Sequence, residues 1–213
     1  MTIWLTRIRL NLRDKAVHRD LHNIVGLHQR LMRMMPTELG PTPRAESGLL
    51  YRIDETRTGT HLLVQSRHYP EFSELPPTYG DTATRELTPL LDRLVTGNTI
   101  SYRLAANTSK RLGRTSERAG KLVALRGEDA QTWWQQRAQR CGLDLHTVSL
   151  LDLPDARGKR IASTPGDRIR HAVTRFDGIA TITDSHALRN AVTGGIGRGR
   201  AHGCGLLSLA VVR

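Results

Sequence analysis

Two kinds of residue periodicity alternate along this chain, and their order limits the possible folds more than any other feature of the sequence. Residues 2–12 alternate apolar and polar side chains from Ile8 onward, which is typical of a β-strand. From Asp20 or Asn23, both candidate N-caps, apolar residues follow helical spacing until Pro36. The other elements predicted in this half are strands at 48–54 and 60–67, a helix at 82–95 and a strand at 99–106. The order is therefore strand, helix, strand, strand, helix, strand.

The second half of the chain repeats this order. Its predicted elements are a short strand at 121–125, a helix at 128–141, extended segments at 145–153 and 168–183, a helix at 185–192 and a strand at 206–212. Two βαββαβ units in tandem make an α+β, tandem ferredoxin-like fold, an architecture that RNA-recognition modules also use. We therefore expect an N-terminal ferredoxin-like domain over 1–108, a linker over 109–118 and a C-terminal ferredoxin-like domain over 119–213.

The charge balance of the chain indicates a polyanionic partner. Its 213 residues include 32 Lys and Arg against 20 Asp and Glu, a net charge of +12. All but four of these cations are arginines, which bind phosphate through two parallel hydrogen bonds and can stack on bases. A genome rich in arginine codons would explain the excess of Arg over Lys, but not the net charge. The most common partner of such a surface is nucleic acid.

Other features of the composition exclude several classes of protein. The two cysteines, Cys141 and Cys204, are too few for a disulfide framework and form no CxxC pair, which fits a reducing compartment. No uncharged apolar run approaches the ~18 residues of a membrane helix, and the N-terminus lacks the apolar core of a signal peptide. We therefore expect a cytoplasmic protein with no membrane partner.

The strongest local signal is a glycine-rich run, GGIGRGRAHGCG, at 194–205, where six of twelve residues are glycine. Glycines with positive φ can form nests of backbone N–H groups that bind phosphate oxygens. The run is not a dinucleotide-binding fingerprint or a P-loop, since both of those lie between a strand and a helix, and this one lies between a predicted helix and strand. It is either a phosphate-binding loop or a permissive connector. As a phosphate-binding loop it would use Gly195, Gly197, Arg198, Gly199, Arg200, His202, Gly203 and Gly205.

The same run resembles the C-terminal glycine-rich signature of the repeat-associated (RAMP) superfamily of CRISPR proteins. Its segments GIG and GCGLLSLA are most similar to those of the CasE family, endoribonucleases that process CRISPR RNA. Shorter resemblances follow in the family's order: WLTRIRLN at the start, LHQRL at 27–31, LLYRI at 49–53, LLVQS at 62–66 and YRLAAN at 102–107. The last departs at Ala105 and at the following Thr108, where the family has a basic residue and proline. The resemblance implies tandem ferredoxin-like domains that bind an RNA hairpin and cut its base without metal or cofactor.

Such cleavage uses the ribose 2′-OH as nucleophile, and it needs a base, an acid and cations that stabilise the charged phosphorus centre. The resemblance places the catalytic histidine at His28, within LHQRL, although His28 also falls in the helix's apolar stripe, as a packed core histidine would. Arg33 resembles a basic family position suited to the scissile phosphate; an exposed, solubilising arginine is the alternative. Relatives often have a tyrosine three residues before the histidine, where this chain has Val25. His202 is a second candidate because it lies in the glycine-rich run.

A basic segment in the second half is predicted to be an exposed hairpin that contacts the phosphates of an RNA stem; a solvated charge run is the alternative. Its cations are Arg157, Lys159, Arg160, Arg168 and Arg170.

Three other patterns are weaker. His18-Arg-Asp imitates a kinase catalytic loop without the required Asn. His18 and His22 have the spacing of zinc ligands but lack a HExxH glutamate and a third ligand. Trp133 and Trp134 are expected in the core.

The sequence thus leads to one hypothesis and one alternative. The hypothesis is an endoribonuclease that cleaves precursor CRISPR RNA at the 3′ base of the repeat hairpin. By resemblance, it would stay bound to the product and join other Cascade subunits. The alternative is a non-catalytic RNA-binding subunit of the same superfamily.

Overall fold

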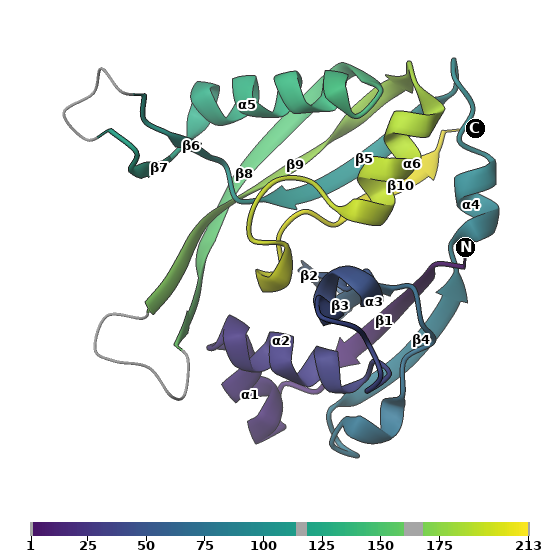
Figure 1. Ribbon diagram of the computed structural model, residues 1–213, viewed down its shortest axis with the longest axis vertical. Coiled ribbons are helices and arrows are strands. Elements are labelled where there is room, and N and C mark those ends of the chain that lie inside the picture. The colour runs from purple at the N-terminus through teal and green to yellow at the C-terminus, as the bar shows by residue number, and fades with distance from the viewer. Residues whose placement is uncertain (1, 114–118, 160–167, 213) are drawn as a thin grey trace. The chain divides into compact units, whose positions relative to one another are not determined.

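The computed structural model describes residues 2–113, 119–159 and 168–212 (Figure 1). Within these, the chain divides into two compact units, and neither unit is continuous in sequence. The first contains residues up to 93, with 156–170 and 200–203, and the second contains 94–155, 171–199 and the residues from 204 onward. No helix in the described ranges is long and apolar enough to cross a bilayer.

The first unit is built on a four-stranded sheet of order β2-β3-β1-β4 in which all neighbours are antiparallel. Its strands are β1 (Trp4–Leu10), β2 (Leu50–Thr56), β3 (Gly59–Ser66) and β4 (Gly80–Glu86). The helices α1 (Lys15–Leu21), α2 (Ile24–Arg33) and α3 (Pro43–Ser47) lie between β1 and β2 in the chain, and the 3-10 turn η1 (Phe72–Glu74) precedes β4. Apolar side chains of α2, among them Leu27 and Leu31, pack with Ile8, Leu62 and Val64 of the sheet to form the core. This is the ferredoxin-like strand order.

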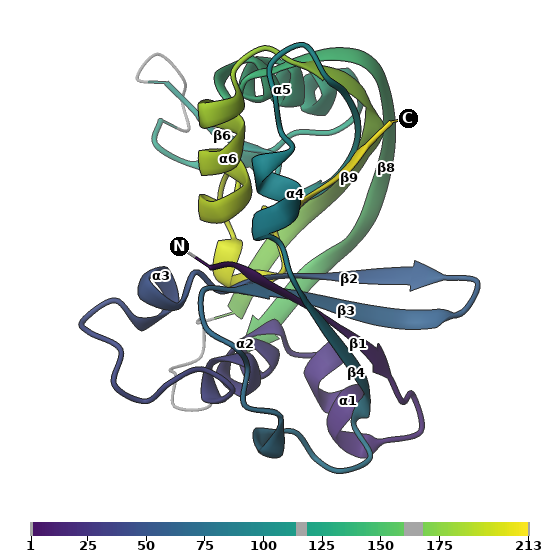
Figure 2. The ribbon, with the colours of Figure 1, turned by 90° about the vertical axis from the view of Figure 1, so that its right-hand side faces the viewer.

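The second unit has the same order in its sheet, β10-β5-β9-β8. The strands are β5 (Thr99–Ala106), β8 (Leu143–Lys159), β9 (Arg168–Ile182) and β10 (Leu207–Val211), and the helices are α5 (Gly127–Arg140) and α6 (Ser185–Gly194). Figure 2 shows α5 and α6 on the same side of β8 and β9. The ring of Trp134 in α5 stacks on Phe176 of β9 and contacts Tyr102 of β5, so aromatic side chains fill this core. The α+β, tandem ferredoxin-like class predicted from the sequence is confirmed.

Two of the differences from the prediction move the division of the chain. Residues predicted as a helix at 82–95 form strand β4 and the short helix α4 (Thr88–Asp92). The strand predicted at 121–125 is β7 (Leu122–Ala124), which pairs only with β6 (Ser109–Arg111) in a separate two-stranded sheet. Strand β5 therefore opens the second sheet instead of closing the first, and the chain passes to the second unit after Arg93, not at residue 108.

The distribution of leucine and threonine explains why residues 82–95 form a strand followed by a short helix. Leu87, Leu91 and Leu94, which have helical spacing, are buried in and around α4. The residues before them include the β-branched Thr82 and Thr84, which pair with Ile8 and Thr6 of β1. β-Branched side chains fit a pleated strand better than a helix, where they lose rotamer freedom.

Candidate active site

Helix α2 carries the predicted catalytic histidine, and its start is set by Asn23. The side chain of Asn23 accepts a hydrogen bond from the backbone N–H of Val25 at 3.2 Å, which confirms Asn23, and not Asp20, as the N-cap of this helix. His28 lies in the second turn and is half-buried. The apolar residues on either side, Leu27 and Leu31, are buried in the core, so the imidazole lies at the edge of the packed face.

The end of β8 is held against the start of this helix within the first unit. The backbone N–H of Lys159 donates to Asn23 Oδ1 at 3.1 Å, and Asn23 Nδ2 donates to the Lys159 carbonyl at 3.3 Å. Gly158 is buried there, and a Cβ atom at this position would lie 2.9 Å from Ile24 and Val25. The lack of a side chain at Gly158 thus allows the basic strand to approach α2.

A short segment of the glycine-rich run also belongs to the first unit, the 3-10 turn η2 (Arg200–His202) with Gly203. Gly203 has φ +80°, and a Cβ there would lie 3.1 Å from the ring of Tyr51 in β2. The Tyr51 hydroxyl donates to the Ile24 carbonyl of α2 at 3.3 Å. Tyr51 therefore supports both η2 and the helix that carries His28.

This arrangement brings two imidazoles together. The rings of His28 and His202 lie edge to face, with centroids 6.2 Å apart and planes at 78°. Both side chains are half-buried, so neither is sealed in the core. The alternative that His28 is simply a packed core histidine is thus disfavoured by its position beside a second titratable ring.

The charge of Arg44 acts on His28, and the charge of Arg200 acts on Arg44. Burial lowers the pKa of His28 below its usual value near 6.5, and the positive charge of Arg44 lowers it further. Burial also lowers the pKa of Arg44, and the charge of Arg200 adds to that effect. The Nδ1 atom of His28 is buried without a hydrogen-bond partner among the described residues. The site therefore holds His28 neutral near pH 7 and gathers positive charge beside it, as a phosphate-binding site requires.

Arg44 was not predicted from the sequence, whereas Arg33, which was, lies elsewhere. Arg44 belongs to α3, which begins with Pro43 after the Thr42 cap position. Arg33 is exposed in the last turn of α2. At about 100° per residue, five residues turn a helix by ~140° beyond a full turn, so Arg33 is not on the His28 face.

The rest of the glycine-rich run belongs to the second unit. Its glycines at 195, 197, 199 and 205 have φ angles of 75°, 77°, 72° and 91°, in the left-handed region that favours glycine. A Cβ at Gly197 would lie 3.3 Å from Trp133, and one at Gly199 would lie 3.4 Å from His171. Arg198 is exposed and its backbone pairs with Asn107, while the N–H of Gly205 donates to the Ala105 carbonyl at 2.7 Å. Of the predicted loop residues, only Arg200, His202 and Gly203 share the first unit with His28.

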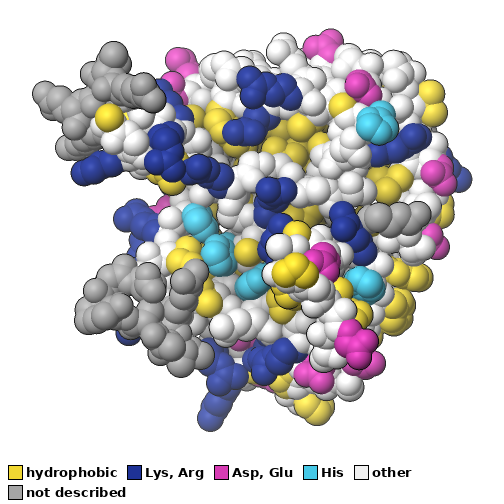
Figure 3. Space-filling view, in the orientation of Figure 1, with side chains coloured by type: hydrophobic (Ala, Val, Ile, Leu, Met, Phe, Trp, Pro, Cys, Tyr) yellow, Lys and Arg dark blue, Asp and Glu magenta, His cyan; other side chains and the backbone are white. Residues whose placement is uncertain are grey.

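The predicted hairpin cations are exposed where the structure describes them. These are Arg157, Lys159, Arg168 and Arg170; Arg160 lies outside the described residues. All four belong to the first unit. Figure 3 shows Lys and Arg side chains spread widely over one face, where histidines also reach the surface.

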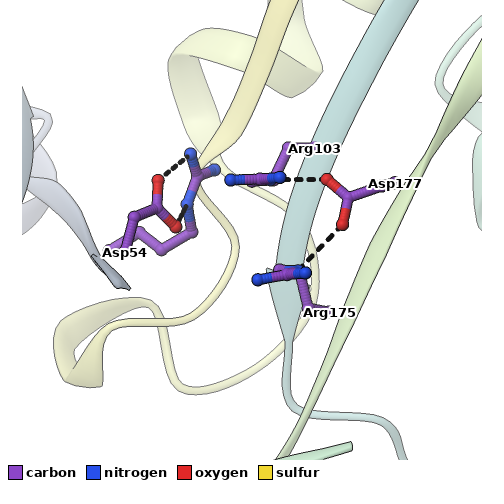
Figure 4. A network of polar contacts seen from close by, with 5 residues as sticks. Asp54, Arg103, Arg175 and Asp177 are labelled. Carbon is purple, nitrogen blue, oxygen red and sulfur yellow. Dashed lines mark hydrogen bonds and ion pairs between the residues drawn. The ribbon is translucent and has the colours of Figure 1, made fainter. Parts of the chain in front are cut away.

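Other arginines are paired with carboxylates. In the second unit, Arg103 and Arg175 bind the two oxygens of Asp177, at 2.5 and 2.8 Å (Figure 4). In the first unit, Arg52 binds Asp54 through two hydrogen bonds of 2.8 Å. These ion pairs join side chains on the strands of the two sheets. The number of arginines alone therefore overstates the positive charge that is available to a ligand.

The tryptophan pair and the His18/His22 pair, singled out in the sequence, have ordinary local contacts in the structure. Trp133 and Trp134 are buried, as predicted. His22 Nδ1 lies 2.7 Å from the His18 carbonyl, a bond within the turn of one helix. Over residues 2–113, 119–159 and 168–212, no three His, Cys, Asp or Glu side chains gather as metal ligands would.

Comparisons with known proteins agree with this picture over nearly the whole chain. A family model described as CRISPR associated protein matches residues 3–211. The chain is 30% identical over 205 residues to the CRISPR system Cascade subunit CasE of Escherichia coli, covering 92% of this chain and 94% of that protein. It is 28% identical over 219 residues to the CRISPR-associated endoribonuclease Cse3 of Thermus thermophilus, covering 98% and 100%.

Solved structures show the same likeness. A structure of the CRISPR endoribonuclease Cse3 bound to 19 nt RNA matches with a TM-score of 0.81 and 29% identity, over 99% of this chain and 100% of that one. A chain of a CRISPR RNA-guided surveillance complex matches with a TM-score of 0.75 and 40% identity, over 98% and 100%. The glycine-rich signature, the fold and these matches agree, and the chain therefore belongs to the CasE family of CRISPR-associated proteins.

Proposed function

We propose that this chain is an endoribonuclease that binds the repeat hairpin of precursor CRISPR RNA and cleaves it at the 3′ base of the stem. The observation that carries the proposal is the cluster of His28, Arg44, Arg200 and His202 in the first unit. It places a neutral imidazole, which can transfer protons, near two guanidinium groups, which can stabilise charge on a phosphodiester. The names of the matched relatives, an endoribonuclease and a Cascade subunit, support the same reading.

In this mechanism His28 is the general base. Its lowered pKa keeps the imidazole neutral near pH 7, so it can accept the proton of the ribose 2′-OH. The 2′-oxygen then attacks the neighbouring phosphorus, and the bond to the 5′-oxygen breaks. The products are a 2′,3′-cyclic phosphate and a 5′-hydroxyl. Arg44 and Arg200 stabilise the charge that develops on the phosphoryl oxygens.

The exposed cations of β8 and β9 would hold the stem of the hairpin. Double-stranded RNA is recognised mainly through its shape and its backbone phosphates, and Arg157, Lys159, Arg168 and Arg170 present four cations from one unit. The bonds between Lys159 and Asn23 tie this surface to the helix of His28. Stem binding would therefore help to place the scissile phosphate. The product stays bound, as part of an effector with other Cascade subunits.

The decisive experiment incubates the protein with the repeat RNA of its host in EDTA, alongside His28→Ala. Removal of a general base costs ~10²–10⁴-fold in rate, so the variant should bind RNA normally and cleave at least ~10²-fold more slowly. His22→Ala is the matched control, since His22 is exposed near the same helix and outside the cluster.

Three results would contradict the proposal. Full cleavage by His28→Ala would show that His28 is not the general base. A requirement for divalent metal would contradict the metal-independent mechanism. Binding without cleavage by the unmodified protein would leave the alternative, a non-catalytic RNA-binding subunit.

A further inference from the structure

Cleavage by a 2′-OH needs two proton transfers, and one imidazole cannot perform both at once. The proton leaves the 2′-oxygen on one side of the phosphorus, and the 5′-oxygen needs a proton on the other side, because the attacking and leaving oxygens lie roughly in line. His28 accounts for the first transfer only. A second group must lie within hydrogen-bond reach of the same phosphate, about 2.6–3.2 Å from the atom it protonates.

Two residues near His28 are poor candidates for this second role. Val25, one turn before His28, is apolar and 7% exposed. Tyr51 has a hydroxyl, but it is 1% exposed and donates to the Ile24 carbonyl. A phosphate in solvent cannot reach either side chain without opening the core.

We propose that His202 is the general acid that protonates the 5′-oxygen leaving group, an inference that rests on the function proposed above. His202 comes from η2, while His28 comes from α2, and their ring centroids are 6.2 Å apart. At that separation one phosphodiester at the rim of both rings can accept a hydrogen bond of ordinary length from each. Both side chains are half-buried, so each ring is partly accessible from solvent.

The local structure keeps the second ring in place. Gly203 follows His202 in the left-handed region and lies against the ring of Tyr51. Tyr51 in turn holds α2 through the Ile24 carbonyl. The two imidazoles are thus positioned by one shared support, although they are 174 residues apart in the chain.

The surroundings of His28 favour the role of base, which leaves the role of acid to His202. Burial and the charge of Arg44 disfavour the protonated form of His28, so the pKa of His28 suits a base. In the reaction, His28 gains the 2′-OH proton as the bond from the 2′-oxygen to phosphorus forms. The bond from phosphorus to the 5′-oxygen breaks, and that oxygen takes a proton from the His202 imidazolium. Exchange with water restores both rings, so no other reactant is needed.

The test uses a repeat RNA whose scissile 5′-oxygen is replaced by sulfur. A thiol has a pKa near 8.5 in a cysteine side chain, far below that of an alcohol, so a thiolate leaves without a general acid. The variant is His202→Phe, which keeps an aromatic ring in η2 and removes the proton donor. Single-turnover rates are measured for both RNAs with the unmodified protein, His202→Phe and His28→Ala.

We expect His202→Phe to lose about 10²-fold in rate on the oxygen substrate and to recover most of this loss on the sulfur substrate. His28→Ala should be slow on both, because the 2′-OH still needs a base. RNA affinity and thermal unfolding of His202→Phe should match those of the unmodified protein.

The remaining outcomes separate the two proposals. Equal losses on both substrates would mean that His202 positions the phosphate, and an undiminished rate would mean that it has no role; either result overturns the inference and leaves the nuclease. No cleavage of the oxygen substrate by the unmodified protein would overturn the proposed function itself.

Discussion

The two ferredoxin-like units share one strand order but use the helix after their first strand differently. In the first unit that segment includes α2, which places His28 at the edge of the packed face beside Arg44. In the second unit it includes α5, which turns Trp134 fully into the core against Phe176. The same topology thus positions a half-buried histidine in one unit and packed aromatic rings in the other. What differs is whether the residue at the helix face is titratable and half-buried, or large and sealed.

The largest effect should come from the packed helix. Trp134→Ala empties a site that is 0% exposed, and such changes cost ~3–5 kcal/mol. Chemical denaturation should therefore show a strong loss of stability, while His28→Ala should leave the unfolding midpoint nearly unchanged. Equal destabilisation of the two variants would contradict the view that α5 serves mainly packing while the His28 side chain of α2 does not.

The next effect separates the two arginines. Hydrogen bonds to charged groups are worth ~1.5–3 kcal/mol, so Arg44→Ala should slow single-turnover cleavage by about 10–100-fold. Arg33→Ala removes an exposed side chain on another face and should change the rate by no more than about twofold. A larger loss of rate for Arg33→Ala than for Arg44→Ala would indicate that Arg33, and not Arg44, contacts the phosphate.

The two N-caps offer a smaller, matched comparison. Asn23→Ala and Asp184→Ala each remove a cap, from α2 and α6 respectively, and each should cost about 1 kcal/mol of stability. Only Asn23→Ala also breaks the bonds to Lys159. Gel-shift and cleavage assays should therefore show weaker RNA binding for Asn23→Ala and normal binding for Asp184→Ala.

The smallest effect is a displacement of the pH profile. In the proposed mechanism the neutral form of His28 is the base, and its lowered pKa keeps that form populated below pH 6.5. The acid limb of kcat/KM, which reports the free enzyme, should therefore have its midpoint below 6.5. His202 and Arg44 face His28, and Arg200 acts on Arg44 in turn. Arg44→Ala should move the midpoint upward; a downward shift would contradict the assigned influence of that charge.

Much of the fold could be predicted from local pattern, but sheet membership could not. The alternation around Ile8 and the capped helix after Asn23 are local properties, and both are present in the structure. Strand β5 has a clear strand pattern as well. Its partners are β9 and β10, more than 60 residues away, and no local periodicity encodes that pairing. This is why the predicted division at residue 108 differs from the one after Arg93.

The candidate site was also predictable only where its features are local in the sequence. The glycine spacing predicted left-handed backbone, and the φ angles of Gly195 to Gly205 agree. His28 came from the family resemblance, and the structure adds its neighbour His202. Arg44 left no signal, because it lies between the helix predicted to end at Pro36 and the strand predicted from residue 48, where the sequence predicted no element. Its influence on His28 depends on tertiary folding alone.

The discontinuity of the first unit has a consequence for the order of synthesis. A ribosome makes His28 early, but it reaches His202 only after the strands β5, β8 and β9 have been synthesised. An unfinished chain therefore carries one imidazole without its neighbour. If both rings are needed to cut RNA, the enzyme is inert throughout its own translation, while messenger RNA lies beside it.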